Sequence, residues 1–291
     1  MPNLRVITWN SGGEADGRGA TLTAFANAVN AAYYNPAVAG SVPVQVVVTQ
    51  ESSVGGGGSI AAALAIAPFN QFATGHYREH VPPGAGQPHR VGMSKAYRLG
   101  WMNAHPTVAL NLVPAGGAPA HHLINLDPAH DAGVAAWING LPLSPGIRTM
   151  VRDAAANMRW PVYQAFAYAG TSVHVITWHV ELRANWLGAN VHGPMVAQGL
   201  PEAFLFLQNS TFYLNLIATL GANDLIVIAG DLNATGAEMG NALFFNAYAG
   251  VFDNLTHILA FSPNGAMNFL EHQAHVTPYP PHCIVTARVS W

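Results

Sequence analysis

Residues with oxygen-bearing and imidazole side chains follow several apolar runs in this sequence. Asp231 and Asn233 come directly after residues 225–230, a short run rich in β-branched residues that predicts a strand buried on both faces. A spacing of two places both side chains on one side of an extended segment. A carboxylate beside an amide is suited to a hard cation or a phosphate. The alternative is an Asx turn after the strand, because Asp and Asn are common turn formers.

Four other strand-like runs carry a polar residue at one end. Asn10 ends the run 4–9, Glu51 follows the run 43–49, His179 ends the run 172–178, and His282 precedes the run 283–289. Carboxylate and amide oxygens are ligands that Mg²⁺ prefers. Histidine titrates near neutrality, so two histidines can divide proton abstraction from proton donation. Polar residues therefore stand at five strand ends in this chain.

The elements that must position these residues alternate between strands and helices. The first two strands are connected by a helix at 21–34, which is a common plan for building a site at strand ends. We expect a hairpin of 161–168 and 172–178, and one long helix at 202–220. Further predicted elements are helices at 59–67 and 237–248 and strands at 96–101, 106–113 and 268–272. We expect a single domain over residues 1–291, with a long insertion or loop at about 116–158, most clearly at 116–146.

Composition narrows the classes of function. Only 9% of the 291 residues are charged, the net charge is −3, and no cluster of Lys and Arg occurs, which argues against a strong electrostatic grip on nucleic acid. The single Cys283 excludes an intramolecular disulfide, and no Gly-Lys-Ser/Thr follows the glycines at 55–58, so a P-loop is not predicted. His76 and His80 lack an evident third zinc ligand.

The sequence predicts a protein without a membrane anchor. No apolar run reaches the roughly 20 residues that span a bilayer, and no signal peptide is recognisable. We therefore expect a soluble protein that is cytoplasmic or exported without a recognisable signal peptide.

The order of these motifs resembles the endonuclease/exonuclease/phosphatase superfamily, which includes deoxyribonuclease I, the nuclease subunit of cytolethal distending toxin, and sphingomyelinase. The resemblance spans residues 8–282, and residues 158–161 (Met-Arg-Trp-Pro) also resemble the family's Arg-x-Pro stretch. The motifs that carry it are Trp9-Asn10, Gln50-Glu51, Trp178-His179, Gly230-Asp231-Leu232-Asn233 and Pro281-His282.

The resemblance implies a deoxyribonuclease I-like α/β fold, a four-layer sandwich of two packed mixed β-sheets flanked by helices. It also implies hydrolysis of a phosphoester with a divalent cation, usually Mg²⁺, with Mn²⁺ or Ca²⁺ also possible. Carried over residue by residue, it implies metal binding by Glu51, Asn10 and Asp231, and phosphate binding by Arg159 and Asn233. It also implies that Asp231 and Asn233 orient the attacking water, that His179 and His282 form the acid–base pair, and that Glu271 orients His282.

Two departures from the family pattern bear on catalysis. The family's last motif is Ser-Asp-His, whereas Pro281 precedes His282 in this chain. No acidic residue that would pair with His179 is identifiable from the sequence.

Three hypotheses follow. The first is a metal-dependent phosphodiesterase, a DNA endonuclease of the deoxyribonuclease I or distending-toxin kind. The second is a phosphatase or phospholipase that acts on a small or lipid phosphoester, which the low positive charge favours. The third is a binding protein on the same fold with weakened catalysis, which Pro281 favours.

Overall fold

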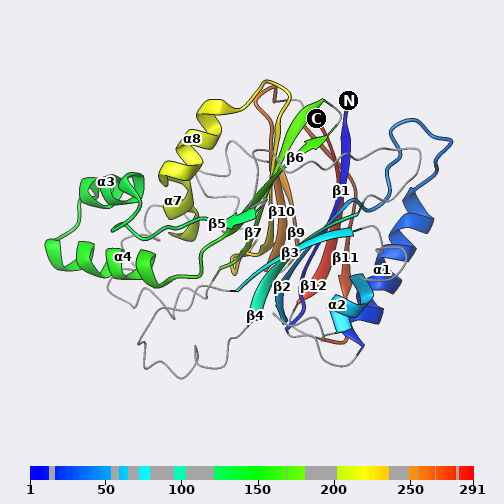
Figure 1. The fold of residues 1–291 in the computed structure, drawn as a ribbon, viewed down its shortest axis with the longest axis horizontal. Helices are drawn as coiled ribbons and strands as arrows, with labels where there is room; N and C mark the ends of the chain where they lie inside the picture. Colours follow the sequence, from blue (N-terminus) through cyan, green and yellow to red (C-terminus); the bar gives the residue numbers. More distant parts are fainter. Residues whose placement is uncertain are drawn as a thin grey trace.

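The structure, a computed structural model, describes residues 1–12, 17–53, 59–64, 72–78, 95–102, 121–168, 170–180, 202–235, 249–253, 255–265, 267–279 and 282–291. Two β-sheets form its centre (Figure 1), and the described residues contribute six strands to each. The first sheet has the strand order β11-β12-β1-β2-β4-β3, and the second has the order β5-β6-β7-β8-β10-β9. The strands are β1 (Asn3–Asn10), β2 (Val46–Ser53), β3 (Phe72–Arg78), β4 (Lys95–Met102), β5 (His121–Leu123), β6 (Val162–Tyr168), β7 (Thr171–His179), β8 (Leu225–Asp231), β9 (Ala249–Asp253), β10 (Thr256–Phe261), β11 (Asn268–Val276) and β12 (Cys283–Ser290).

Among the described strands, each sheet contains one parallel pair, and these pairs set where the functional residues meet. β1 runs parallel to β2 with Asn10 opposite Gln50, and β7 runs parallel to β8 with His179 opposite Asp231. The other described strand pairs are antiparallel. Parallel neighbours end at the same edge of a sheet, so each pair delivers two polar residues to one place.

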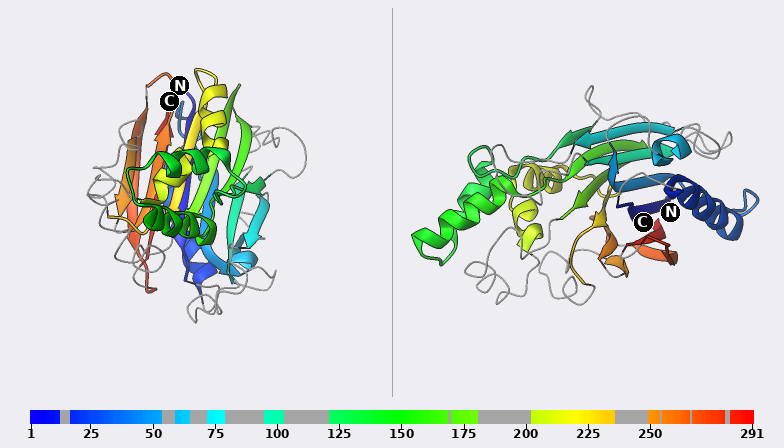
Figure 2. Two further views of the ribbon diagram at one scale, coloured as in Figure 1. Left: turned by 90° about the vertical axis from the view of Figure 1, so that its left-hand side faces the viewer. Right: turned by 90° about the horizontal axis from the view of Figure 1, so that it is seen from below.

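Helices lie on both sides of the stacked sheets (Figures 1 and 2). On one side, α1 (Arg18–Tyr33) and α2 (Ser59–Leu64) pack on the first sheet, where Phe25 shares a core cluster with Ile7 and Trp9. On the other side are α3 (Ala132–Gly140), α4 (Pro145–Asn157), α7 (Glu202–Gln208) and α8 (Thr211–Thr219). There Phe204 of α7 meets Trp178 of β7 edge-on, with ring centroids 5.7 Å apart. The predicted four-layer α/β sandwich is confirmed.

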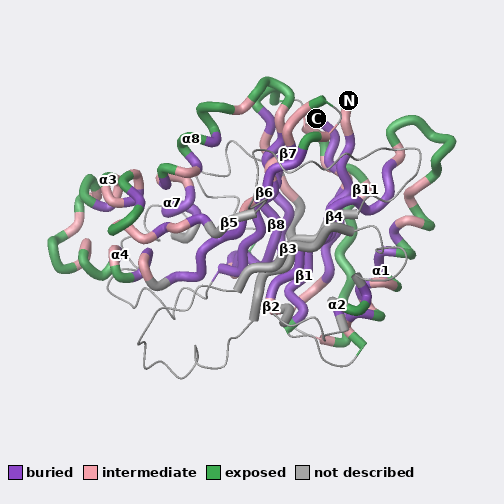
Figure 3. The backbone as a smooth tube through the Cα atoms, viewed as in Figure 1, coloured by how far each residue is buried: buried purple, intermediate pink, exposed green. Residues whose placement is uncertain are grey.

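Alternation along β1 explains how one strand serves two layers. Leu4 and Val6 face the core between the sheets, whereas Ile7 and Trp9 face the helices, and all four are at most 2% exposed. β8 is buried at every position, as its continuous apolar run predicts (Figure 3). The site is therefore built in part on two strands, β1 and β8, that are buried at every position.

The predicted insertion at about 116–158 is wrong as a loop. Its described part contains β5, α3 and α4, and Val134, Ile138 and Val151 join the main core cluster. Both helices have side-chain caps, because Asp131 accepts from Val134 N at 2.9 Å and Ser144 accepts from Ile147 N at 3.4 Å. Gly and Pro in this stretch start and end helices.

The long helix predicted at 202–220 is two helices. Ser210 ends the first and caps the second, because its hydroxyl accepts from Tyr213 N at 3.1 Å and donates to Leu207 O at 2.8 Å. Asp131, which caps α3, also connects α3 to the start of the second helix, since its carboxylate accepts from Thr211 N at 3.0 Å. A polar pair inside an apolar period therefore marks a helix end here.

Other sequence predictions have mixed outcomes. The helix at 21–34 and the hairpin at 161–178 are confirmed as α1 and as β6 with β7. β3, β9 and β10 were not predicted. The strand predicted at 106–113 and the helix predicted at 237–248 lie outside the described residues. In the part of the chain that the structure describes, every helix is too short or too polar to cross a membrane.

Candidate active site

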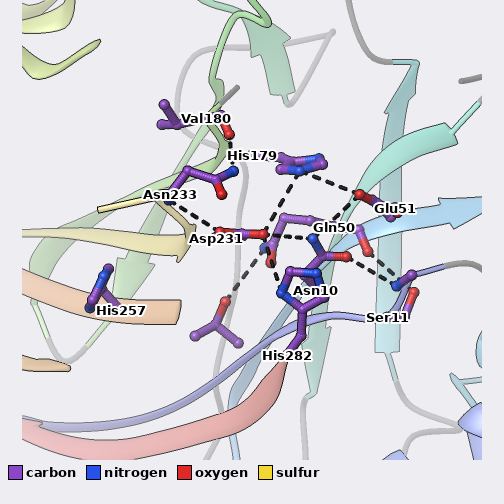
Figure 4. Close-up of polar contacts among 12 residues, drawn as sticks. Asn10, Ser11, Gln50, Glu51, His179, Val180, Asp231, Asn233, His257 and His282 are labelled. Carbon is purple, nitrogen blue, oxygen red and sulfur yellow. Dashed lines mark hydrogen bonds and ion pairs between the residues drawn. The ribbon is translucent and has the colours of Figure 1, made fainter. Parts of the chain in front are cut away.

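Side chains from both sheets converge at one edge of the sandwich (Figure 4). β1 and β2 supply their members from the first sheet, β7 and β8 supply theirs from the second, and one more precedes β12. The converging residues are Asn10, Glu51, His179, Asp231 and His282, with Asn233 beside Asp231. The structure thus brings together the strand-end residues that the sequence singles out.

Two carboxylates form the centre of this site. Asn10 Nδ2 donates to Asp231 Oδ2 at 2.7 Å and lies 3.5 Å from Glu51 Oε1. His179 Nε2 lies 3.4 Å from Glu51 Oε1 and 3.8 Å from Asp231 Oδ2. The side chain of Asp231 is 1% exposed and that of Glu51 is 14% exposed. Two carboxylates held together with little solvent favour a bound cation, because their like charges repel.

The donor set fits a hard divalent ion. Among the described residues, no group of three or more His, Cys, Asp and Glu side chains has the arrangement of a metal centre. Mg²⁺ does not require three such side chains, because it is commonly held by one or two carboxylates with several waters and substrate oxygens. Glu51 and Asp231 satisfy that requirement, and they are the residues that would hold the ion.

Asn10 lies differently from a metal ligand. Its amide oxygen accepts from Gly12 N at 3.0 Å, which turns the amide nitrogen toward both carboxylates. In this arrangement Asn10 holds the carboxylate pair together by donating hydrogen bonds. Its role as an oxygen ligand of the metal stays a prediction.

Glu51 reaches the site because β2 is bulged. β2 advances three residues, from Thr49 to Ser52, while its partner β4 advances two, from Arg98 to Ala96. Glu51 takes the left-handed conformation with φ 57°, which is uncommon for a residue other than glycine. The extra residue re-aims the chain, so both side chains face inward, with that of Glu51 in the site and that of Gln50 behind it (Figure 4).

The turn after β8 is held at several points. Asn233 has φ 47°, its backbone N–H donates to Asp231 Oδ1 at 3.1 Å, and its amide nitrogen donates to the carbonyl of Val180. Leu232 N donates to Leu255 O at 2.9 Å. Upstream, a Cβ on Gly230 would lie 1.9 Å from the carbonyl oxygen of Trp178, so only glycine allows β7 this close. Phosphate binding by Asn233 stays a prediction.

His179 is placed between a guanidinium and the carboxylates. Arg159 Nη1 lies 3.0 Å from His179 Nδ1 and 2.7 Å from His179 Nε2, and both residues are buried. The backbone of Arg159 is anchored by Trp178, whose indole N–H donates to Arg159 O at 2.8 Å. The acidic neighbours that the sequence did not reveal for His179 are Glu51 and Asp231. Phosphate binding by Arg159 stays a prediction.

His282 meets the carboxylate pair from the other side. Its Nδ1 lies 3.4 Å from Asp231 Oδ2, and its side chain is 17% exposed. Thr277 fixes the approach, because its hydroxyl donates to His282 O at 3.1 Å and accepts from Tyr279 N at 3.1 Å. Pro281, which stands where the family has an acidic residue, lies outside the described residues.

The prediction that Glu271 orients His282 is wrong. The Glu271 carboxylate pairs with Arg5 and accepts from Arg288 at 2.8 and 3.1 Å. β11 is antiparallel to β12, so Leu270 lies opposite Arg288 at the far end of β12 from His282. Burial opposes the charged form of Glu271, but the hydrogen bonds and charges of Arg288 and Arg5 outweigh it and lower its pKa below the ordinary value.

Two buried residues that sequence reasoning missed support the site. Gln50 donates to Thr177 Oγ1 at 3.0 Å and lies within hydrogen-bond distance of Thr8 Oγ1 at 3.4 Å. His257 lies opposite Gly230 on β10, is fully buried, and hydrogen-bonds the carbonyl of Ala234 through Nε2. A glutamine directly after an apolar strand was a usable signal for Gln50. His257 lies in a strand that the sequence pattern did not reveal.

Comparison with known proteins agrees with this architecture. No protein-family model and no curated protein matches the sequence. The structure is similar to the human Nocturnin catalytic domain with bound sulfate, with a TM-score of 0.54 and 14% identity over 99% of this chain and 93% of that one. It is also similar to D. rerio TDP2 complexed with a single-strand DNA product, with a TM-score of 0.53 and 11% identity over 100% of both chains.

A third similarity carries a family description. An endonuclease/exonuclease/phosphatase family protein from Leptotrichia buccalis C-1013-b aligns with a TM-score of 0.53 and 9% identity, over 99% of this chain and 100% of that one. The chain shares the fold of these three structures. At such low identities the similarity establishes the fold, and the residues of the site have to carry the argument about chemistry. In this chain the fold brings the ends of the two parallel pairs, β1 with β2 and β7 with β8, to one edge.

Proposed function

We propose that this protein is a divalent-metal-dependent phosphodiester hydrolase. The observation that carries the proposal is that two carboxylates and two histidines from both sheets meet in one cluster. Glu51 contacts His179, His179 contacts Asp231, and Asp231 contacts His282, each within 4 Å. Carboxylates supply hard ligands, and imidazoles move protons near neutral pH. Metal-assisted hydrolysis of a phosphoester can use both, the carboxylates to hold the ion and the imidazoles to transfer protons.

Glu51 and Asp231 would hold the metal ion. When bound, a divalent ion neutralises charge that develops on the phosphate oxygens and lowers the pKa of a bound water. Mg²⁺ is the first candidate because it accepts a partly hydrated site with few protein ligands, and Mn²⁺ and Ca²⁺ are alternatives. Arg159 contacts His179 and Asn233 contacts Asp231, and both are the candidates for contacting the phosphate.

The histidines divide the proton transfers. Asp231 faces His282 Nδ1 and favours the tautomer that carries its proton there, which leaves Nε2 as an acceptor. His282 would take a proton from the attacking water as its oxygen bonds to phosphorus. The ester P–O bond breaks, and His179 would give a proton to the departing oxygen. Asn233 and Asp231 orient the water, since the turn that carries both is held rigidly.

DNA is the first substrate candidate, cleaved within the strand as by an endonuclease. Support comes from D. rerio TDP2, a structure of the same fold complexed with a single-strand DNA product. Single-stranded nucleic acid demands fewer phosphate contacts than a duplex that is gripped along both strands.

A small or lipid phosphoester is the second candidate, and the placement of charge favours it. The chain has only 11 Lys and Arg residues in 291. Arg5 and Arg288 are bound to Glu271, and Arg148 and Arg152 hydrogen-bond Asn139 at 3.0 and 2.6 Å. These four cations are committed to structural contacts, whereas DNA binding usually takes several phosphate contacts.

Hydrolysis assays decide between these substrates. The protein is incubated with single-stranded DNA, plasmid DNA, bis(p-nitrophenyl) phosphate and sphingomyelin vesicles, each with Mg²⁺ and with a chelator. We expect chelator-sensitive cleavage of at least one diester, lost in His282→Ala by roughly 10²–10⁴-fold. His272→Ala is the matched control, because His272 is exposed on β11. Absence of hydrolysis by the wild-type protein on every substrate would leave a binding protein on this fold.

A further inference from the structure

Gln50 is fully buried beneath the site, where it connects the two sheets. Its side-chain amide hydrogen-bonds Thr177 of β7 at 3.0 Å and approaches Thr8 of β1 at 3.4 Å. Thr177 lies two residues before His179, and Thr8 lies two residues before Asn10. Either orientation of the amide preserves this bridge, because a threonine hydroxyl both donates and accepts.

The backbone of Gln50 is tied down as well. Its carbonyl accepts from Ser11 N at 3.0 Å and from Ser11 Oγ at 3.2 Å, and Ser11 is 1% exposed. Gln50 therefore fastens the end of β2 to the end of β1 and to β7 at once. Figure 4 shows it behind the cluster of Asn10 and Asp231.

The position of Gln50 in the bulge gives this bridge its significance. In a regular strand, successive side chains point to opposite faces, so Gln50 and Glu51 could not both face the site. The bulge and the left-handed φ of Glu51 turn both inward. A left-handed conformation costs a residue other than glycine roughly 1–2 kcal/mol. The contacts of Gln50 are what hold that conformation in register with His179.

We infer that Gln50 is a positioning residue for the hydrolysis proposed above, holding the Glu51 carboxylate against His179 and Asp231 through its bridge between the sheets. The inference rests on the proposed function. It predicts that the bridge sets metal affinity and rate, beyond any contribution to stability.

The chain offers a matched control at the other end of β2. Gln45 is 1% exposed and also bridges the sheets, since its Oε1 accepts from Arg5 N at 2.9 Å and its Nε2 donates to Tyr168 at 3.2 Å. Gln50→Met and Gln45→Met each replace a buried amide by an apolar side chain of similar length. Both should lower stability, because each leaves hydrogen-bonding groups without partners.

The experiment compares Mn²⁺ affinity by calorimetry with kcat and KM for bis(p-nitrophenyl) phosphate. We expect Gln50→Met to lose at least tenfold in Mn²⁺ affinity and about 10²-fold in kcat, with both values within twofold of wild type in Gln45→Met. Thr177→Val removes the bridge from the opposite sheet, so the double variant with Gln50→Met should lose much less than the product of the two separate effects. Thr177→Val also serves as the test if Gln50→Met does not fold.

Two failures are distinguishable. If wild type binds Mn²⁺ and hydrolyses the diester while Gln50→Met and Thr177→Val keep its affinity and rate, Gln50 is a structural residue only and the inference is wrong. If wild type neither binds the ion nor hydrolyses any substrate, the proposed function is wrong and the inference falls with it.

Discussion

Replacing Glu51 with glutamine removes one charge from the carboxylate pair and keeps the shape of the side chain. Glu51 Oε1 and Asp231 Oδ2 lie 3.5 and 2.7 Å from the same nitrogen of Asn10. The two oxygens are therefore at most about 6 Å apart, and at an effective dielectric constant of about 20 their charges repel by roughly 3 kcal/mol. Hydrogen bonds from Asn10 offset part of this repulsion. Without metal, we expect the free energy of unfolding to stay unchanged or to rise by up to about 3 kcal/mol.

The same substitution should have the opposite effect when metal is present. A ligand at 100 times its Kd stabilises the folded state by about 2.7 kcal/mol. If Glu51→Gln lowers the affinity about 100-fold, that stabilisation falls to roughly 0.4 kcal/mol at the same concentration. The variant should therefore be less stable than wild type in Mn²⁺, whereas in chelator it should be equally or more stable.

Urea unfolding at pH 8 with chelator and with Mn²⁺ measures both effects, and calorimetry gives the affinity directly. Asp153→Asn on the exposed face of α4 controls for the change from acid to amide. A variant that loses more than about 1 kcal/mol in chelator would show that Glu51 is a structural acceptor rather than one of two repelling charges. Unchanged Mn²⁺ affinity would remove Glu51 from the metal site.

Three further predictions concern the supporting structure. Asp131→Ala should cost about 1–4 kcal/mol in urea unfolding, because one carboxylate caps both α3 and α8, and an unchanged midpoint would contradict this. Glu271→Gln should cost about 3 kcal/mol at pH 7, since Arg5 is fully buried. The pKa of Glu271 is lowered, so this stability is present above the unfolded-state pKa of about 4.3 and is lost as the pH falls through the lower folded-state pKa. His257→Leu should keep the circular dichroism spectrum but lower kcat by roughly 10–10², and an unaltered kcat would show that the bond to Ala234 does not position the turn.

The strand ends could be predicted because their signals are local. An apolar β-branched run closed by a polar residue specifies both a buried strand and the place where it ends, and β8 with Asp231 follows that rule. The break between α7 and α8 was also encoded locally, in Asn209-Ser210, but the apolar period on either side concealed it. α3 and α4 were concealed differently, since the Gly and Pro residues in and around them are typical of loops as well as of helix ends.

The prediction for Glu271 was wrong for a reason that the length of the connection between β11 and β12 could have revealed. Only residues 277–282 separate β11 from β12, and so short a connection permits a hairpin but not a parallel crossover, which needs a dozen or more residues. In an antiparallel hairpin, residues early in the first strand lie opposite the end of the second. Glu271 therefore cannot lie beside His282 at the start of β12, whatever its identity suggests. The resemblance supplied a residue type at a position in the sequence, and topology decided where that position lies.

The position of Glu51 could not be predicted from the period of two along β2. A period of two assigns alternate residues of β2 to alternate faces, so it places either Gln50 or Glu51 in the site and excludes the other. The structure places both there, at the expense of a left-handed residue inside a bulge. Nothing in the local sequence marks this bulge, because glycine, its usual sign, is absent from residues 46–53. Partners far away in the chain hold it instead, namely Ser11 and Thr177. A strained backbone that is fixed from another sheet is typical of a functional site. The bulge that a period of two does not predict therefore favours a function for Glu51.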